Sequence, residues 1–254
     1  VVLTNNTHRN AVVNLARGHV HALRHQQVSG RKRDRHFAGD DADHLRAAIS
    51  PQKVIPAKAI KPGVVAPYES DQTTHFSVVD EEGNAVSNTY TLNFSYGVGI
   101  VADGTGVLLN NELDDFAAKP GVPNAYGLVG GDANAPGPRK RPLSSMSPTM
   151  VFRNGELELV TGSPGGSRII TVVLQVLLNA IDHKMNIADA VRAPRIHHQW
   201  VPDQVIIERG MPNAIVQALE GRGHKPALRP LLTSANSIMI APNGTGTAMT
   251  WRVR

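Results

Sequence analysis

Alternating apolar and polar positions predict a β-hairpin in the second quarter of the chain. The strands are expected over residues 76–79 and 86–92, with the turn sequence EEGN between them. Thr73 stands at the start of the first strand. Because side chains repeat every two residues along a strand, we expect Thr91 and Asn93 on one face of the second strand, pointing toward one site.

A longer apolar pattern follows further along the chain. From Ile169 to Ile181, apolar residues recur at helical spacing and predict a helix that we interpret as core. Beyond it, the pattern predicts a strand over 204–209, a helix over 212–221 and a strand over 237–241, all of which look like scaffold.

Composition bounds the class of protein. A chain of 254 residues with 41% hydrophobic content can bury a substantial core and suits one large or two modest domains. Thr171, Gln175 and Asn179 interrupt the apolar helix, and no apolar run approaches the roughly 18 residues of a membrane span. The chain has no cysteine, which excludes disulfides and thiolate sites. No signal-peptide pattern opens it.

The positive charge lies almost entirely in residues 1–50. They hold eight Lys or Arg against four Asp, a net charge of +4 out of +5 for the whole chain. Residues 51–254 carry 18 basic and 17 acidic residues, so they do not have the charge of a nucleic-acid-binding protein.

The same first segment holds six of the eleven histidines. Three interpretations compete: a nucleic-acid or metal-binding arm, a disordered solvated tail, and sequence translated in a wrong frame, which fits the composition best. His19, His21 and His25 form the most metal-like group, but no partner follows at a spacing that fixes a geometry. We assign residues 1–50 no function.

Residues 51–72 connect that segment to the hairpin. Prolines at 51, 56, 62 and 67 forbid a long helix and favour an extended, exposed strip. Such a strip suits a cleavage site. A threonine hydroxyl is a weak nucleophile unless a base takes its proton, and a cut between Gln72 and Thr73 would supply that base as the new α-amine of Thr73. Thr74 would have no free amine of its own. The hypothesis is a self-processing amidase.

Five sequence blocks extend this hypothesis. They are TTHFSVVDEEGNAV, LLNNELDDF, KPGVPNAYGLVGGDAN, RPLSSMSPTM and TGSPGGSRI, in that order. From Thr73 to about Ile240 the chain closely resembles the small subunit of gamma-glutamyltransferases, members of the N-terminal nucleophile hydrolase superfamily. Residues 51–72 look like the end of the family's large subunit, and the family's cut falls immediately before the nucleophilic threonine.

The resemblance implies a role for each candidate residue. Thr73 is the nucleophile, Thr91 supports it by hydrogen bonding, and Asn93 helps to hold the α-amine of the γ-glutamyl donor. Glu112 and Asp115 bind the donor's ammonium. Contacts to its α-carboxylate come from Ser144 and Ser145, and the tetrahedral oxyanion is stabilised by the backbone amides of Gly165 and Gly166.

From the residues alone, these assignments have alternatives. A carboxylate cluster such as that around Glu112 also suits a solvated turn or, less well, a metal site. Two glycines before a helix are also an ordinary helix-start loop. The glycine-rich stretch 121–134 corresponds to a lid loop in bacterial relatives and lacks the phosphate-loop spacing. His197 and His198 are expected to be structural.

The implied fold is α+β, an αββα sandwich that is incomplete here because most of the large subunit is absent. Residues 73–254 form its small-subunit-like catalytic region, and the large subunit is the expected partner. Family members are exported to the periplasm or the cell exterior. The family's arginine ligand for the carboxylate lies in the large subunit and has no counterpart here. After 242–244 the chain departs from the family's SDPR-like continuation, which suggests an altered terminus and an uncertain last strand pairing.

The implied activity is acyl transfer from glutathione or another γ-glutamyl amide, through an ester on Thr73, to water, an amino acid or a peptide. This chemistry requires no metal or organic cofactor. One rival is a glutaryl-cephalosporin acylase, whose substrate lacks the α-ammonium that Glu112 and Asp115 would bind. The other is a non-catalytic fragment with a basic interaction arm.

Overall fold

The computed structural model of the protein describes residues 11–13, 53, 73–94, 96–122, 129–199, 203–230 and 232–250. Most of the first 72 residues, including Gln72 and the histidine group, lie outside these ranges. The described elements are β1 (Ala11–Val13), β2 (Thr74–Val79), β3 (Ala85–Tyr90), η2 (Glu112–Asp115), η3 (Asp132–Asn134), β4 (Thr149–Arg153), β5 (Glu156–Gly162), α2 (Arg168–Ile181), α3 (Ile187–Arg192), β6 (Ile196–His197), β7 (Val205–Glu208), α4 (Asn213–Gly221), β8 (Pro226–Arg229), β9 (Asn236–Ile240) and β10 (Gly246–Thr250).

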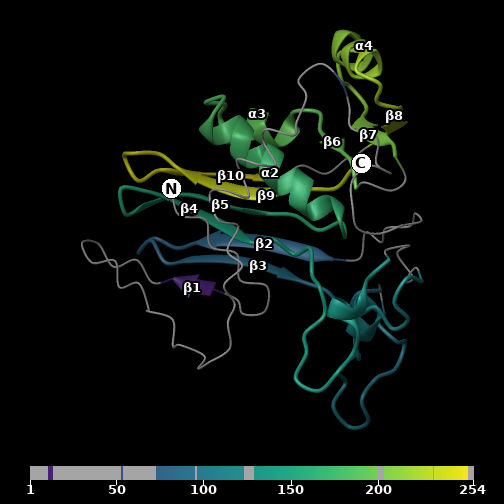
Figure 1. The fold of residues 1–254 in the computed structure, drawn as a ribbon. Coiled ribbons are helices and arrows are strands. Elements are labelled where there is room, and N and C mark those ends of the chain that lie inside the picture. Colours follow the sequence, from purple (N-terminus) through teal and green to yellow (C-terminus); the bar gives the residue numbers. More distant parts are fainter. Residues whose placement is uncertain are drawn as a thin grey trace.

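Two sheets packed face to face form the centre of the molecule (Figure 1). The first has the strand order β1-β3-β2, and the second has the order β10-β9-β5-β4. Helices α2 and α3 cover the outer face of the second sheet. A third sheet, β6-β7-β8, lies beside this sandwich with α4. The fold is α+β, as the resemblance implied, and its layers are ordered helix, sheet, sheet.

The apolar core lies between α2, α3 and the second sheet. Helix α2 buries Ile169, Val172, Val173 and Val176, which share one helical face. They pack with residues of β4 and β5, of which Leu159 is fully buried. The helix occupies the residues over which the apolar spacing predicted it.

Three later elements have bounds within one residue of those predicted, which confirms the predictions. They are β7, α4 and β9. The last strand pairing, which the departure from the family's pattern had left uncertain, is present. Strand β10 pairs with β9 in antiparallel register, from Gly246 opposite Ile240 to Thr250 opposite Asn236.

The second strand of the hairpin is shorter than predicted. Strand β3 ends at Tyr90, so Thr91 and Asn93 do not belong to it. The Thr91 hydroxyl accepts a hydrogen bond from the Asn93 amide at 2.9 Å, and Asn93 has a φ of 71°. A side-chain bond of this kind competes with the strand ladder, and asparagine tolerates the left-handed region better than most residues. The chain therefore turns where strand alternation was expected to continue.

Candidate active site

The strand registers bring the candidate segments to one end of the sandwich. In the hairpin, Thr74 at the start of β2 lies opposite Tyr90 at the end of β3. In the second sheet, Gly162 at the end of β5 lies opposite Asn236 at the start of β9. The Asn236 side chain donates to the His75 carbonyl, which joins these two pairs across the sheets. Segments before β2, after β3, after β5 and before β9 therefore emerge together.

Thr73 lies next to the inner face of the hairpin. In β2, His75 is buried and Ser77 half-buried, whereas Thr74 and Phe76 are exposed. Thr73 has the phase of His75 in this alternation and is half-buried. The exposed Thr74 has the opposite phase. The inner face of β2 packs on the second sheet, so this phase directs Thr73 toward the end of β5 rather than away from it.

His75 fixes the hairpin to the second sheet. Its ring nitrogens lie 2.7 Å from Thr89 Oγ1 and 3.1 Å from Ser77 Oγ, and Ser77 in turn donates to the Asn236 carbonyl at 3.0 Å. Burial lowers the pKa of His75 to about 4, so the ring is neutral at pH 7. A Cβ on Gly162 would lie 2.1–2.6 Å from ring atoms of His75, so any larger residue there would displace the ring.

Asn93 connects the end of the hairpin to the acidic segment. Its side chain is buried and donates from Nδ2 to the Asn111 carbonyl at 3.2 Å. The Asn111 side chain accepts from the Phe94 amide at 3.0 Å, and its amide donates to the Leu92 carbonyl at 3.1 Å. These bonds place η2, which begins at Glu112, beside the turn at Asn93.

Glu112 and Asp115 form a half-buried carboxyl pair. Burial, a hydrogen bond to Asp115 and the nearby negative charge raise the pKa of Glu112 to about 8. Burial also raises the pKa of Asp115. Glu112 Oε1 is buried and has no hydrogen-bond partner among the described residues. Such a pair suits a cationic group that would replace the shared proton, and it is unlike the solvated turn that an acidic cluster usually forms.

Asn134, which the sequence analysis placed only at the end of the glycine-rich stretch, joins two candidate segments. Its Nδ2 donates to the Asp115 carbonyl at 2.7 Å, and its Oδ1 accepts from the Leu143 amide at 2.9 Å. Leu143 directly precedes Ser144. No local pattern marks these contacts, because Asp115 ends the short helix η2 and Leu143 lies in a loop, and neither segment has a periodic pattern. Residues 123–128 of the expected lid are outside the described ranges.

Ser144 and Ser145 are half-buried in the loop before β4. The Ser144 hydroxyl accepts from the Met146 amide at 3.3 Å, and the Ser145 carbonyl accepts from Ser147 Oγ at 3.0 Å. Since Thr149 in β4 lies opposite Thr161 near the end of β5, this loop approaches the same end of the sandwich as the other segments.

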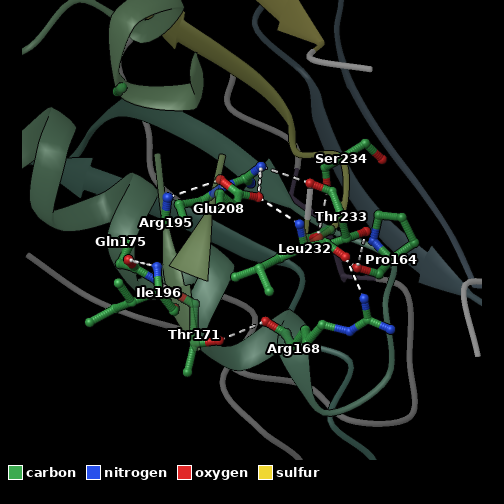
Figure 2. Close-up of polar contacts among 12 residues, drawn as sticks. Pro164, Arg168, Thr171, Gln175, Arg195, Ile196, Glu208, Leu232, Thr233 and Ser234 are labelled. Atoms are coloured by element: carbon green, nitrogen blue, oxygen red, sulfur yellow. Dashed lines mark hydrogen bonds and ion pairs between the residues drawn. The ribbon is translucent and has the colours of Figure 1, made fainter. Parts of the chain in front are cut away.

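Gly165 and Gly166 form the loop between β5 and α2. Both have positive φ values, 119° and 59°. The Gly165 carbonyl accepts from the Arg168 amide at 3.2 Å, and the Gly166 carbonyl accepts from the Ile169 amide at 3.1 Å. Their own amides precede the first turn of α2, where backbone N–H groups and the helix dipole favour negative charge. Figure 2 shows this loop beside residues 232–234.

The two histidines expected to be structural have structural contacts. His197 is buried, with Nδ1 2.8 Å from Thr171 Oγ1 and Nε2 3.1 Å from Gln199 Oε1. Burial lowers the pKa of His197. His198 Nε2 lies 3.3 Å from Asp203 Oδ1. None of the described helices is long and apolar enough to cross a bilayer.

Comparison with known proteins identifies the relatives of this arrangement. The family model of gamma-glutamyltranspeptidase matches residues 32–252. The glutathione hydrolase proenzyme of Escherichia coli K12 is 60% identical over 203 residues, which cover 80% of this chain and 35% of the relative. The corresponding protein of Pseudomonas sp. A14 is 58% identical over 66% of this chain and 29% of its own length. The chain thus spans about a third of these relatives.

Solved structures show the same likeness. A Helicobacter pylori gamma-glutamyltranspeptidase variant is 54% identical with a TM-score of 0.65, over 70% of this chain and 97% of that chain. A cephalosporin acylase from Bacillus halodurans is 25% identical with a TM-score of 0.65, over 86% of this chain and 39% of that chain. The sandwich is therefore that of the N-terminal nucleophile hydrolases, and the chain belongs to the gamma-glutamyltranspeptidase family.

Proposed function

We propose that this chain carries the nucleophile and most of the substrate pocket of a self-processing γ-glutamyl hydrolase and transferase. The observation that carries the proposal is the convergence, at one end of the sandwich, of the start of β2 with the loop at Gly165 and with the half-buried pair of Glu112 and Asp115. Family membership supports this activity, and the E. coli relative is named a glutathione hydrolase proenzyme.

The reaction begins with processing. Cleavage between Gln72 and Thr73 frees the α-amine of Thr73, whose reference pKa is roughly 7.7 to 8.0. This amine takes the hydroxyl proton while Thr73 Oγ attacks the γ-glutamyl carbonyl. Amides of Gly165 and Gly166 donate to the resulting oxyanion.

The intermediate then collapses to an ester. The C–N bond breaks, the departing amine receives the proton from the Thr73 ammonium, and the γ-glutamyl group remains on Oγ. Water or the amine of an amino acid or peptide attacks this ester in the second half-reaction, with Thr73 again moving the proton. Glutathione is the expected donor, and Thr91 supports the nucleophile by a hydrogen bond.

The pocket recognises the two charged groups of the donor. Glu112 and Asp115 bind its ammonium through charge-assisted hydrogen bonds, with Asn93 beside them. Ser144 and Ser145 contact its carboxylate. A large-subunit partner completes the pocket and the sandwich, and the assembled enzyme acts in the periplasm or outside the cell.

One experiment tests the activity. The chain is produced alone and together with the large subunit of the E. coli relative, and mass spectrometry follows cleavage before Thr73 while a chromogenic γ-glutamyl anilide reports turnover. Thr73→Ala is the control and should abolish both signals. Absence of cleavage and turnover in both preparations would overturn the proposal in favour of a non-catalytic protein.

The likeness to the Bacillus halodurans cephalosporin acylase supports one alternative, an acylase for glutaryl amides. A glutaryl anilide has the same reacting carbonyl and no ammonium. Because the carboxyl pair at Glu112 and Asp115 is half-buried, we expect the γ-glutamyl anilide to be the better substrate by kcat/KM. The reverse preference would support the acylase.

A further inference from the structure

Residues 232–234 pack against the loop that bears Gly165 and Gly166, although some 70 residues separate the two segments in sequence. Thr233 Oγ1 donates to the Pro164 carbonyl at 2.8 Å, and Arg168 Nη1 donates to the Leu232 carbonyl at 2.7 Å (Figure 2). The Ser163 hydroxyl lies 2.7 Å from both the Pro164 and the Ser234 carbonyl oxygens. Two of these four contacts, from Thr233 and from Ser163, end on one atom, the carbonyl oxygen of Pro164.

That carbonyl belongs to the same peptide unit as the Gly165 amide. A peptide unit is planar and trans, so its C=O and N–H point in opposite directions. Fixing the Pro164 oxygen consequently fixes the direction of the Gly165 N–H. The next peptide unit is fixed in the same way, because the Gly165 carbonyl accepts from the Arg168 amide and thereby sets the direction of the Gly166 N–H.

The first of these peptide units needs an external support. Glycine at 165 has a φ of 119° and can adopt many backbone conformations. Thr233 also limits the space around it, since a Cβ on Gly165 would lie 2.9–3.0 Å from three side-chain atoms of Thr233. The threonine therefore restrains the glycine both by its hydroxyl and by its shape.

A buried ion pair, Arg195 with Glu208, fixes the backbone at Thr233. Arg195 and Glu208 have side chains only 1% and 4% exposed and pair through two bonds, Nε to Oε2 and Nη2 to Oε1, both 3.0 Å. Glu208 Oε1 also accepts from the Leu232 amide at 2.7 Å, and Arg195 Nη2 donates to the Thr233 carbonyl at 2.8 Å. The ion pair therefore fixes the backbone of residues 232–233.

We propose that Thr233 is a positioning residue for catalysis, which aims the Gly165 amide at the oxyanion by holding the Pro164 carbonyl of the same peptide unit. This inference rests on the proposed function. Thr233 touches neither substrate nor reacting atoms in this role. Arg195 and Glu208 act indirectly on the same amide, because they fix the backbone of Thr233.

The test compares two substitutions at this position in the preparation that turns over the γ-glutamyl anilide. Thr233→Val keeps the shape and removes the hydroxyl, and Thr233→Ser keeps the hydroxyl. We expect Thr233→Val to lower kcat about 10- to 100-fold with KM changed less than about twofold, because losing one oxyanion donor outright costs about 10²- to 10³-fold. Thr233→Ser should retain kcat within about threefold.

Thr161→Val is the matched control for the loss of a buried threonine hydroxyl. Thr161 is fully buried and its Oγ1 lies 2.7 Å from Ser237 Oγ, between neighbouring strands of the second sheet. We expect it to lower the melting temperature with kcat unchanged. The inference is overturned if Thr233→Val behaves like this control, or if Thr233→Ser loses as much kcat as Thr233→Val.

Hydrogen exchange separates failure of this inference from failure of the proposed function. In Thr233→Val, amides of residues 165–169 should exchange at least about fivefold faster, whether or not the protein is active, while those of α3 remain unchanged. If the wild-type protein shows no turnover but exchange is still faster in Thr233→Val, Thr233 restrains the Gly165 loop and the proposed enzyme activity is contradicted. Unchanged exchange with unchanged kcat would contradict the positioning role alone.

Discussion

The two faces of the β10-β9-β5-β4 sheet are built from different interactions. Toward α2 and α3, the contact is an apolar cluster that includes Leu159 and Val172. Toward the hairpin, three buried apolar residues are supplemented by hydrogen bonds that radiate from His75 and Ser77. Apolar burial stabilises without fixing direction, whereas hydrogen bonds fix both distance and angle. The helix face therefore supplies stability, and the hairpin face supplies the position of Thr73.

The outer surface of the hairpin extends this contrast. Phe76, Val78 and Tyr90 are 40%, 49% and 52% exposed, although their strand neighbours on the inner face are buried or half-buried. In the described residues no helix covers this surface (Figure 1). A helix layer is what the expected αββα sandwich would place there. In the described residues, the hairpin is therefore packed on one face only, whereas the second sheet is covered on both faces. The exposed face is where the proposed large subunit would pack.

The largest expected effect on stability comes from the helix face. Leu159→Ala removes a fully buried side chain from the apolar cluster and should lower the free energy of unfolding by about 2–5 kcal/mol. Urea denaturation measures it. Leu178→Ala, on the exposed side of α2, should stay within about 0.5 kcal/mol. Equal effects would show that the cluster is not the main source of stability.

Acid should weaken the hairpin face selectively. The pKa of His75 is lowered from 6.5 to about 4, so the unfolded chain binds the proton more tightly than the folded one. The contribution of the neutral His75 ring to the free energy of unfolding is fully present above pH 6.5 and is lost as pH falls toward 4. The loss is roughly 3 kcal/mol, at about 1.4 kcal/mol for each pKa unit. His75→Gln should flatten that dependence in denaturation curves, whereas His183→Gln, at an exposed position, should not.

A methyl group at position 162 should disturb the site more than the stability. In Gly162→Ala the new Cβ must displace the His75 ring, which costs about 1–3 kcal/mol as other overpacked substitutions do. Because Thr73 is two residues from His75, kcat should fall far more than the folded fraction. Gly221→Ala places its Cβ in open space and serves as the control in both assays. Parallel losses of kcat and stability would place the effect on folding instead.

Donor binding should depend on pH through Glu112. Its pKa is raised to about 8, so below that pH the carboxyl is protonated and an incoming ammonium must expel the proton. KM for the donor should therefore fall as pH rises from 6 to 8, by up to about tenfold per pH unit. Glu112→Gln should abolish this slope, and Asp114→Asn should preserve it. An unchanged slope in Glu112→Gln would exclude this carboxyl as its origin.

The smallest effect is expected on the outer surface of the hairpin. Val78→Thr keeps the branched shape at a half-exposed position and should change the stability of the chain alone by less than about 0.5 kcal/mol. Association with the large subunit, measured by calorimetry, should weaken more. A larger loss in the chain alone would mean that this surface is already covered.

Local periodicity accounts for what the sequence predicted correctly. The hairpin turn and helix α2 could be predicted because each depends on the spacing of apolar residues that are close to one another in sequence. The turn at Asn93 was missed because one side-chain bond from Thr91 overrides strand alternation. Contacts such as Thr233 with Pro164 could not be predicted, since they join loops that are distant in sequence and have no periodic pattern of their own.

The side-chain amide of Asn134 has a consequence for the size of molecule that the proposed pocket would accept. Asn134 donates to the Asp115 carbonyl and accepts from the Leu143 amide. These two hydrogen bonds hold the carboxyl pair, Glu112 and Asp115, at a fixed distance from the serine pair, Ser144 and Ser145. In the proposed pocket, this distance would have to match the distance between the ammonium and the carboxylate of the ligand. A molecule in which these two groups are one methylene farther apart or closer together would reach only one of the two pairs. Selectivity for length would then depend on Asn134, a residue that contacts no ligand.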